Sequence, residues 1–144
     1  MTEQEVRQFF LRLKWKRALR RSLIAEQERV TADMCQIRAV DYEKPHVSGG
    51  NRTDIGKMLE AAETKNQVRT KKIARLTLEI EEASGIALDM ISSCDTDIQK
   101  SVLMDRHLQG MTWELMEKVH HYSRQHLWRF EQEGISAIVR NSMK

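Results

Sequence analysis

Polar side chains near the C-terminus of this 144-residue sequence are spaced so that a helix would carry them on one face. Gln125, Arg129 and Gln132 follow one another at steps of four and three residues, which are the separations of neighbours on a helix surface. An arginine can pair with O6 and N7 of guanine, and a glutamine can pair with N6 and N7 of adenine. These residue types at this spacing favour recognition of base edges in the major groove of DNA.

Hydroxyl and cationic residues beside this set suit contacts with phosphate groups. Thr112 and Ser123 each precede a short helical pattern, where a hydroxyl side chain caps a helix N-terminus and can meet a phosphate together with the backbone amides. Arg124 follows Ser123 directly, and Trp128 flanks the base-reading face, where it could contact the sugar–phosphate backbone or pack on other helices. The candidate DNA-binding residues are Thr112, Ser123, Arg124, Gln125, Trp128, Arg129 and Gln132.

The elements that must hold these residues are three short helices, predicted within residues 102 to 130. The first has an apolar face and ends at Gly110, as a helix commonly does at a glycine. The second follows Thr112 and is about two turns long, because His120–Tyr122 interrupts it before the third helix, which Ser123 caps. Two short helices joined by a tight turn, with a polar second helix, are the layout of the helix-turn-helix motif.

The opposite face of the third helix predicts its packing surface. Leu127, Phe130, Gly134 and Ile138 recur there at helical spacing. We expect this face to pack against the other helices while Arg129 points away from them.

Residues 99 to 139 resemble region 4 of the sigma-70 family, and more closely the small sigma-region-4-like regulators of phages and prophages, of the RinA and ArpU type. The resemblance implies a sequence-specific transcriptional regulator, most simply an activator, that works with the host RNA polymerase. The matching residues are Val102, Leu103, Arg106, Gly110, Thr112, Trp113, Glu114, Lys118, Tyr122, Ser123, Leu127, Arg129 and Phe130.

The sequence departs from the family pattern where the two motif helices should cross. Glu117 stands where members usually have a small residue, and His120 stands where they usually have leucine. Because burying an unpaired carboxylate costs several kcal/mol, we expect either a wider crossing or a rotated second helix. In the rotated arrangement Leu115, Met116 and Val119 would form its buried face.

Two long helices joined by a loop are predicted before the motif. The first is expected from Thr2 to Ala32 and the second from Asn51–Thr53 onward, with a loop over residues 40 to 51 that contains Pro45 and a Gly49-Gly50 pair. The second helix carries alternating three- and four-residue spacing, as in a coiled coil. Its partner is either the first helix or a second copy of the chain. The series is Ile55, Leu59, Ala62, Ile73, Leu76, Ile80, Ala83, Ala87 and Met90, interrupted by Asn66 and Arg69.

A basic cluster surrounds Trp15 in the first helix. It is either a contact surface for nucleic-acid phosphates or a solvated face whose long stems cover apolar neighbours. Its members are Arg12, Lys14, Lys16, Arg17, Arg20 and Arg21.

Composition and charge favour an all-α protein. Apolar residues make up 40% of the chain, with one proline and six glycines. No apolar run approaches the roughly 20 residues of a membrane span, and we expect the protein to stay in the cytoplasm with Cys35 and Cys94 reduced. Residues 96 to 144 hold seven cationic and six acidic side chains. Because DNA affinity depends on phosphate neutralisation, a homodimer is expected to bind better than one copy.

No enzyme chemistry is indicated. The five histidines match no zinc spacing, and neither a phosphate-binding glycine loop nor a nucleophile elbow is present. We therefore expect no catalytic residue, metal or cofactor. Residues 1–95 are interpreted as an oligomerisation or interaction domain, and residues 96–140 as a DNA-binding domain whose partner is double-stranded DNA.

Two other functions fit the same pattern. One is a DNA-packaging protein of the small-terminase type, which also joins a helix-turn-helix to oligomerising helices. The other is a helical protein-interaction module that does not bind DNA. A ring of subunits would favour the packaging function, whereas a monomer or dimer fits a regulator.

Overall fold

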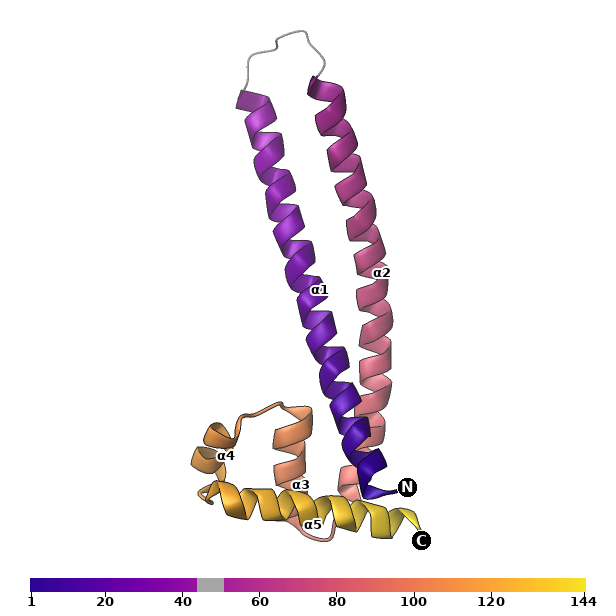
Figure 1. Cartoon of the computed structure of the whole chain (residues 1–144), viewed down its shortest axis with the longest axis vertical. Coiled ribbons are helices and arrows are strands. Elements are labelled where there is room, and N and C mark those ends of the chain that lie inside the picture. The colour runs from indigo at the N-terminus through magenta and orange to yellow at the C-terminus, as the bar shows by residue number, and fades with distance from the viewer. Residues whose placement is uncertain (44–50) are drawn as a thin grey trace. The chain divides into compact units, whose positions relative to one another are not determined.

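The computed structural model describes residues 1–43 and 51–144, so Pro45 and the Gly49-Gly50 pair of the expected loop lie outside the described residues. Every element of the described part is helical, which confirms the all-α prediction (Figure 1). In chain order the elements are α1 (Glu3–Glu43), α2 (Asn51–Ser92), α3 (Asp97–Leu103), η1 (Met104–Leu108), α4 (Trp113–His120) and α5 (Arg124–Ser142). None of the helices in these two ranges combines the length and the apolar character that crossing a membrane requires.

The first helix is longer than expected. The predicted end at Ala32 is wrong, because α1 continues to Glu43. No glycine or proline stands between Asp33 and Glu43, and half-buried Met34 and Ile37 extend the three- and four-residue spacing. The second helix begins at Asn51, as predicted.

The chain forms two compact units that divide both long helices. We call residues 1–17 and 79–144 the terminal unit and residues 18–78 the two-helix unit. These units differ from the division expected at residue 95, since the first turns of α1 and the last turns of α2 belong with the C-terminal helices. Each unit is described by itself below.

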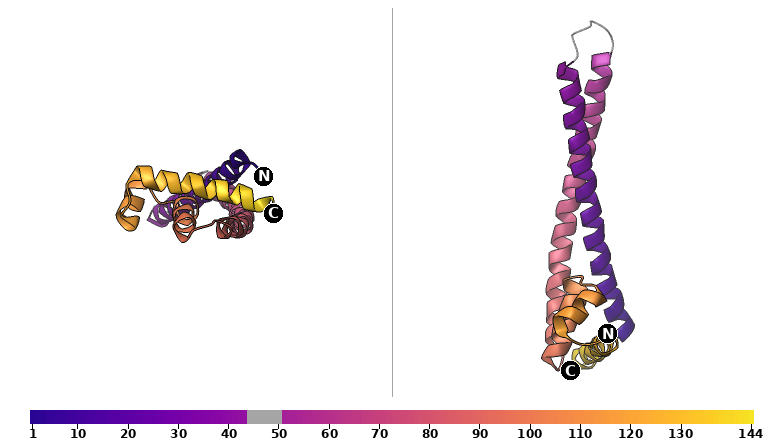
Figure 2. Two further views of the ribbon diagram at one scale, coloured as in Figure 1. Left: turned by 90° about the horizontal axis from the view of Figure 1, so that it is seen from below. Right: turned by 90° about the vertical axis from the view of Figure 1, so that its left-hand side faces the viewer.

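In the two-helix unit, the heptad series of α2 faces α1 of the same chain. The two segments run side by side in Figure 1 and in the right view of Figure 2. Gln27 Nε2 donates to Thr70 Oγ1 at 2.5 Å, and Arg20 lies 3.5 Å from Thr77 Oγ1. Leu76 is buried and Ile73 is half-buried. The contacts thus favour the first of the two partners left open by the sequence.

The polar break in this heptad series is occupied by a small network. Asn66 Nδ2 donates to Thr31 Oγ1 at 3.4 Å, and Arg69 donates to Asn66 Oδ1 at 2.8 Å. Arg69 also lies 3.8 Å from Glu26 on α1. Polar residues at a coiled-coil seam fix its register at a cost in stability, so this network favours a single alignment of the two helices.

The core of the described residues sits almost entirely in the terminal unit. Among the residues whose burial the structure describes, every buried apolar side chain except Leu76 belongs to it. Ile80 is buried, as the heptad series predicted. The members from α1 and α2 are Val6, Phe10, Leu13, Ile80, Ala87 and Ile91, with Cys94 after α2, and those from the later helices are Val102, Leu103, Met116, Leu127, Ile135, Ala137 and Ile138.

Candidate nucleic-acid interface

The two predicted caps set the start of α4 and of α5. Thr112 has extended backbone angles, and its Oγ1 accepts the N–H of Leu115 at 3.3 Å. Ser123 does the same for the N–H of His126 at 3.5 Å. Each cap supplies one of the unpaired amides of a first helical turn with an acceptor. The boundaries that the sequence indicated at these two residues are therefore confirmed.

The turns before and after α4 use left-handed backbone conformations. Gly110 has a φ of +66°, which a glycine adopts without a steric penalty. His121 has a φ of 60° and ends α4, where its N–H donates to the carbonyl of Glu117 at 3.0 Å. A residue with a Cβ pays roughly 1–2 kcal/mol for this conformation. The break that the sequence predicted at His120–Tyr122 thus lies at His121.

Between α3 and the turn the chain forms a π-helical segment, η1, that the sequence pattern did not predict. The N–H of Gln109 donates to the carbonyl of Met104 at 2.9 Å, five residues earlier. Such a widened turn changes the direction of the side chains that it carries. Asp105, Arg106 and His107 each contact a partner from here.

Two histidine–carboxylate pairs connect η1 with the motif helices. His120 Nε2 of α4 lies 2.6 Å from Asp105 Oδ2, and His107 Nε2 lies 2.8 Å from Glu131 Oε1 of α5. Because an ionised carboxylate only accepts hydrogen bonds, the imidazole donates in both pairs. The ring of His107 also stacks on Phe10 of α1, with centroids 4.4 Å apart. His120 therefore has a structural role, joining the last turn of α4 to η1.

The buried face of α4 differs from the rotated arrangement considered from the sequence. Met116 is fully buried, but Leu115 and Val119 are 46% and 51% exposed, so that expectation was wrong for these two residues. The inward positions of α4 are Trp113, Met116, Glu117 and His120, which are all buried or half-buried. The last three follow Trp113 by three, four and seven residues, which is the spacing of one helix face. Glu117 is half-buried in this face, so no rotation of α4 is needed to place it.

The packing face predicted for α5 is confirmed. Leu127, Gly134 and Ile138 are buried and Phe130 is half-buried. Leu127 forms a core cluster with Val102 and Met116 from the other motif helices. A Cβ built on Gly134 would lie 2.8 Å from Leu103 Cδ1. The glycine therefore permits a close approach of α3 and α5.

Six of the seven candidate DNA-binding residues are exposed. Arg124, Gln125 and Trp128, the last 55% exposed, line a hollow of about 410 Å³ together with Trp113. Thr112, Ser123 and Arg129 are exposed as well. The structure brings Arg124, Gln125 and Trp128 together at the N-terminal end of α5.

Gln132 is the exception. It is half-buried, and its Oε1 accepts a hydrogen bond from the guanidinium of Arg7 in α1. Ser136, one turn further along α5, donates to Glu3 of α1 at 2.5 Å. The N-terminal turns of α1 thus occupy this side of α5, and Gln132 has less freedom to reach a base than Gln125 or Arg129.

The basic cluster of α1 divides into two groups. Lys16 lies 3.6 Å from Glu79, Arg17 donates to the carbonyl of Leu108 and to Ser84 Oγ, and Arg20 contacts Thr77. These three residues join α1 to other parts of the chain. Arg12, Lys14 and Arg21 are exposed. Both interpretations of the cluster therefore stay open.

No protein-family model, curated protein or solved structure matches the chain significantly.

Proposed function

We propose that the protein is a sequence-specific DNA-binding transcriptional regulator that uses α5 as its recognition helix. The observation that carries the proposal is the contrast between the two faces of this helix. Leu127 and Ile138 are buried and fix its position, while Gln125 and Arg129, one turn apart, are exposed. A recognition helix needs this combination, because its base-reading side chains must be held in register by a rigid scaffold.

Phosphate contacts are expected at the two helix N-termini. The hydroxyl groups of Thr112 and Ser123 stand at the starts of α4 and α5, and both residues are exposed. Arg124 adds a cation in the first turn of α5. Because phosphate contacts position a protein on the duplex and base contacts give it specificity, the set contains both kinds of residue that such an interface needs.

The biological role is proposed from the resemblance to sigma-region-4-like proteins of phages and prophages. An activator that works with the host RNA polymerase is the role that this resemblance favours. A homodimer in the cytoplasm would double the number of phosphate contacts, which the nearly balanced charge of residues 96 to 144 makes advantageous.

Selection from a random pool of duplex DNA tests the proposal. The full chain is incubated with the pool, bound duplexes are recovered over several rounds, and the recovered sequences are aligned. We expect enrichment of one short site, with a half-site repeat if the protein binds as a dimer. Recovery of unrelated sequences at physiological salt would contradict sequence-specific binding, and a ring-sized assembly in a parallel mass measurement would favour DNA packaging.

A further inference from the structure

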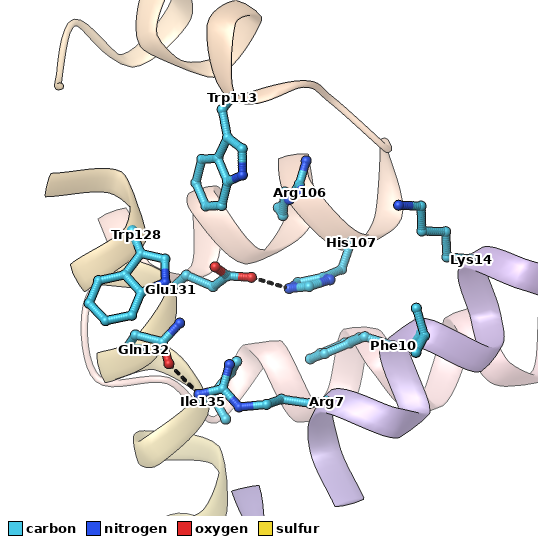
Figure 3. Close-up of a pocket in the computed structure, with 11 residues that line it drawn as sticks. Arg7, Phe10, Lys14, Arg106, His107, Trp113, Trp128, Glu131, Gln132 and Ile135 are labelled. Atoms are coloured by element: carbon cyan, nitrogen blue, oxygen red, sulfur yellow. Dashed lines mark hydrogen bonds and ion pairs between the residues drawn. The ribbon is translucent and has the colours of Figure 1, made fainter. Parts of the chain in front are cut away.

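The terminal unit contains a cavity of about 460 Å³, and two of the candidate DNA-binding residues, Trp128 and Gln132, stand in its lining. It lies between the first turns of α1, the η1 segment, the start of α4 and the middle of α5. Figure 3 shows Trp113 and Arg106 on one side of the cavity and Arg7 and Phe10 on the other. The volume falls within the roughly 300–1,000 Å³ that is usual for small-molecule sites.

Aromatic side chains form part of the lining. Trp113 and Trp128 both border the cavity, and both also border the hollow that contains Arg124 and Gln125. The guanidinium of Arg106 lies over the ring of Trp113, 4.6 Å from its centroid, and donates to the carbonyl of Met111 at 3.1 Å. These contacts hold Trp113 in place. A flat ring entering the cavity would meet Trp128 and the Trp113–Arg106 pair.

The charges of the lining are predominantly positive. Arg7, Lys14 and Arg106 contribute three cations, and Glu131 contributes the single carboxylate. Glu131 accepts a hydrogen bond from His107, and three cations against one carboxylate leave the lining net positive. Within the described ranges, Lys14 makes no hydrogen bond or ion pair, and its ammonium group is exposed at the edge of the cavity (Figure 3).

We propose that this cavity binds a small planar aromatic molecule that carries a carboxylate or a phosphate group. The ring packs against Trp113 and Trp128, and the anionic group pairs with Lys14. Arg7, which already donates to Gln132 and lies 3.9 Å from Glu3, adds positive charge beside it. Charge-assisted hydrogen bonds of this kind are about twice as strong as neutral ones, and stacking on tryptophan adds to them. The proposal does not depend on DNA binding, although Trp128 and Gln132 of α5 border the same cavity.

Titration of the full-length, ¹⁵N-labelled protein without DNA tests the proposal. The probes are 2-naphthoate and 2-naphthyl phosphate, with neutral 2-naphthamide and non-aromatic cyclohexanecarboxylate as comparisons. The chain has three tryptophans, so three indole N–H signals report on the titration, and single tryptophan-to-phenylalanine variants assign them. We expect saturable shifts of the Trp113 and Trp128 signals with both naphthyl anions, while the signal of Trp15, which does not line the cavity, stays in place.

A matched pair of variants tests the role of charge. Lys14→Gln should lower the affinity for both naphthyl anions by about three- to tenfold. Arg12→Gln removes an exposed cation from the same helix outside the cavity and should leave that affinity unchanged. Circular dichroism checks that both variants fold. Tighter binding of one of the two anions identifies the anionic group that the site prefers. Equal affinity for 2-naphthamide, an equal effect of both substitutions, or no saturable shift with either anion would overturn the proposal.

Discussion

His120 Nε2 lies 2.6 Å from Asp105 Oδ2, and this hydrogen bond ties the last turn of α4 to η1. Both side chains are largely withdrawn from water. The next residue, His121, leaves the helix in a left-handed conformation and leads to the cap of α5 at Ser123. The His120–Asp105 pair therefore helps to fix the turn between the two motif helices.

This relationship predicts a coupling between the two side chains. Asp105→Ala leaves the imidazole of His120 without its acceptor and should lower the free energy of unfolding by about 1–3 kcal/mol. The double variant Asp105→Ala/His120→Leu removes both polar partners, which can be nearly neutral, so it should regain much of the loss. Urea unfolding of both single variants, the double variant and the exposed-site control Asp89→Ala measures the coupling. Additive effects of the two substitutions would show that the pair does not stabilise the turn.

Glycines in two helices should respond in opposite ways to alanine. At Gly134 a new Cβ would lie 2.8 Å from the buried side chain of Leu103, and overpacking of this kind typically costs about 1–3 kcal/mol. At Gly85 in α2 it would meet nothing within 4 Å, so the gain in helix propensity of roughly 0.5–1 kcal/mol is retained. Gly134→Ala should lower the melting temperature and Gly85→Ala should raise it. Equal stabilisation by both would contradict the close approach of α3 and α5.

The two cysteines should differ in reactivity. Burial, with a smaller effect from Asp95, raises the pKa of the Cys94 thiol to about 11, and its Sγ lies 3.5 Å from the carbonyl of Gly134. Because the thiolate is the reactive form, a thiol whose pKa is raised to about 11 is largely unreactive at pH 8, and burial blocks access further. Cys35 is exposed. Iodoacetamide at pH 8 should add one group to the native protein and two in urea, and rapid double labelling of the native protein would contradict this.

Buried Gln99 offers a route to higher stability. Its Oε1 has no hydrogen-bond partner among the described residues, and an unsatisfied buried polar atom costs roughly 1–3 kcal/mol. Gln99→Met has nearly the same shape and removes the polar amide. We expect it to raise the free energy of unfolding by about 1 kcal/mol, as measured by chemical denaturation. A loss of stability would show that the amide makes contacts that the methionine cannot replace.

Local signals in the sequence predicted the boundaries of the motif helices. Thr112, Ser123 and Gly110 act through hydrogen bonds or backbone angles within a few residues of themselves, so their roles can be read without knowledge of the fold. The heptad series of α2 could also be predicted, because its three- and four-residue spacing depends only on the geometry of that helix and on its having one buried face.

Contacts between distant residues could not be predicted in this way. The partners of His120 and His107 are 15 and 24 residues away, and their pairing depends on η1, which has no local sequence signature. The position of Gln132 was missed for a similar reason, because Arg7 reaches it across 125 residues of sequence. Leu115 and Val119 are exposed because Met116 is the apolar residue of α4 that packs inward. The sequence alone did not show which of these three apolar side chains would be buried.

The affinity of the Arg129→Ala variant for the selected DNA site tests the proposed function most directly. Arg129 is exposed on the outer face of α5, and loss of a bidentate base contact should weaken binding to that site by about 1–3 kcal/mol while the melting temperature barely changes. Arg75→Ala removes an exposed cation from the two-helix unit and serves as the control. Fluorescence anisotropy at one fixed salt concentration, on the selected site and on a random duplex, gives the specificity ratio. We predict a lower ratio for Arg129→Ala alone, whereas parental affinity for the site in that variant would contradict α5 as the recognition helix.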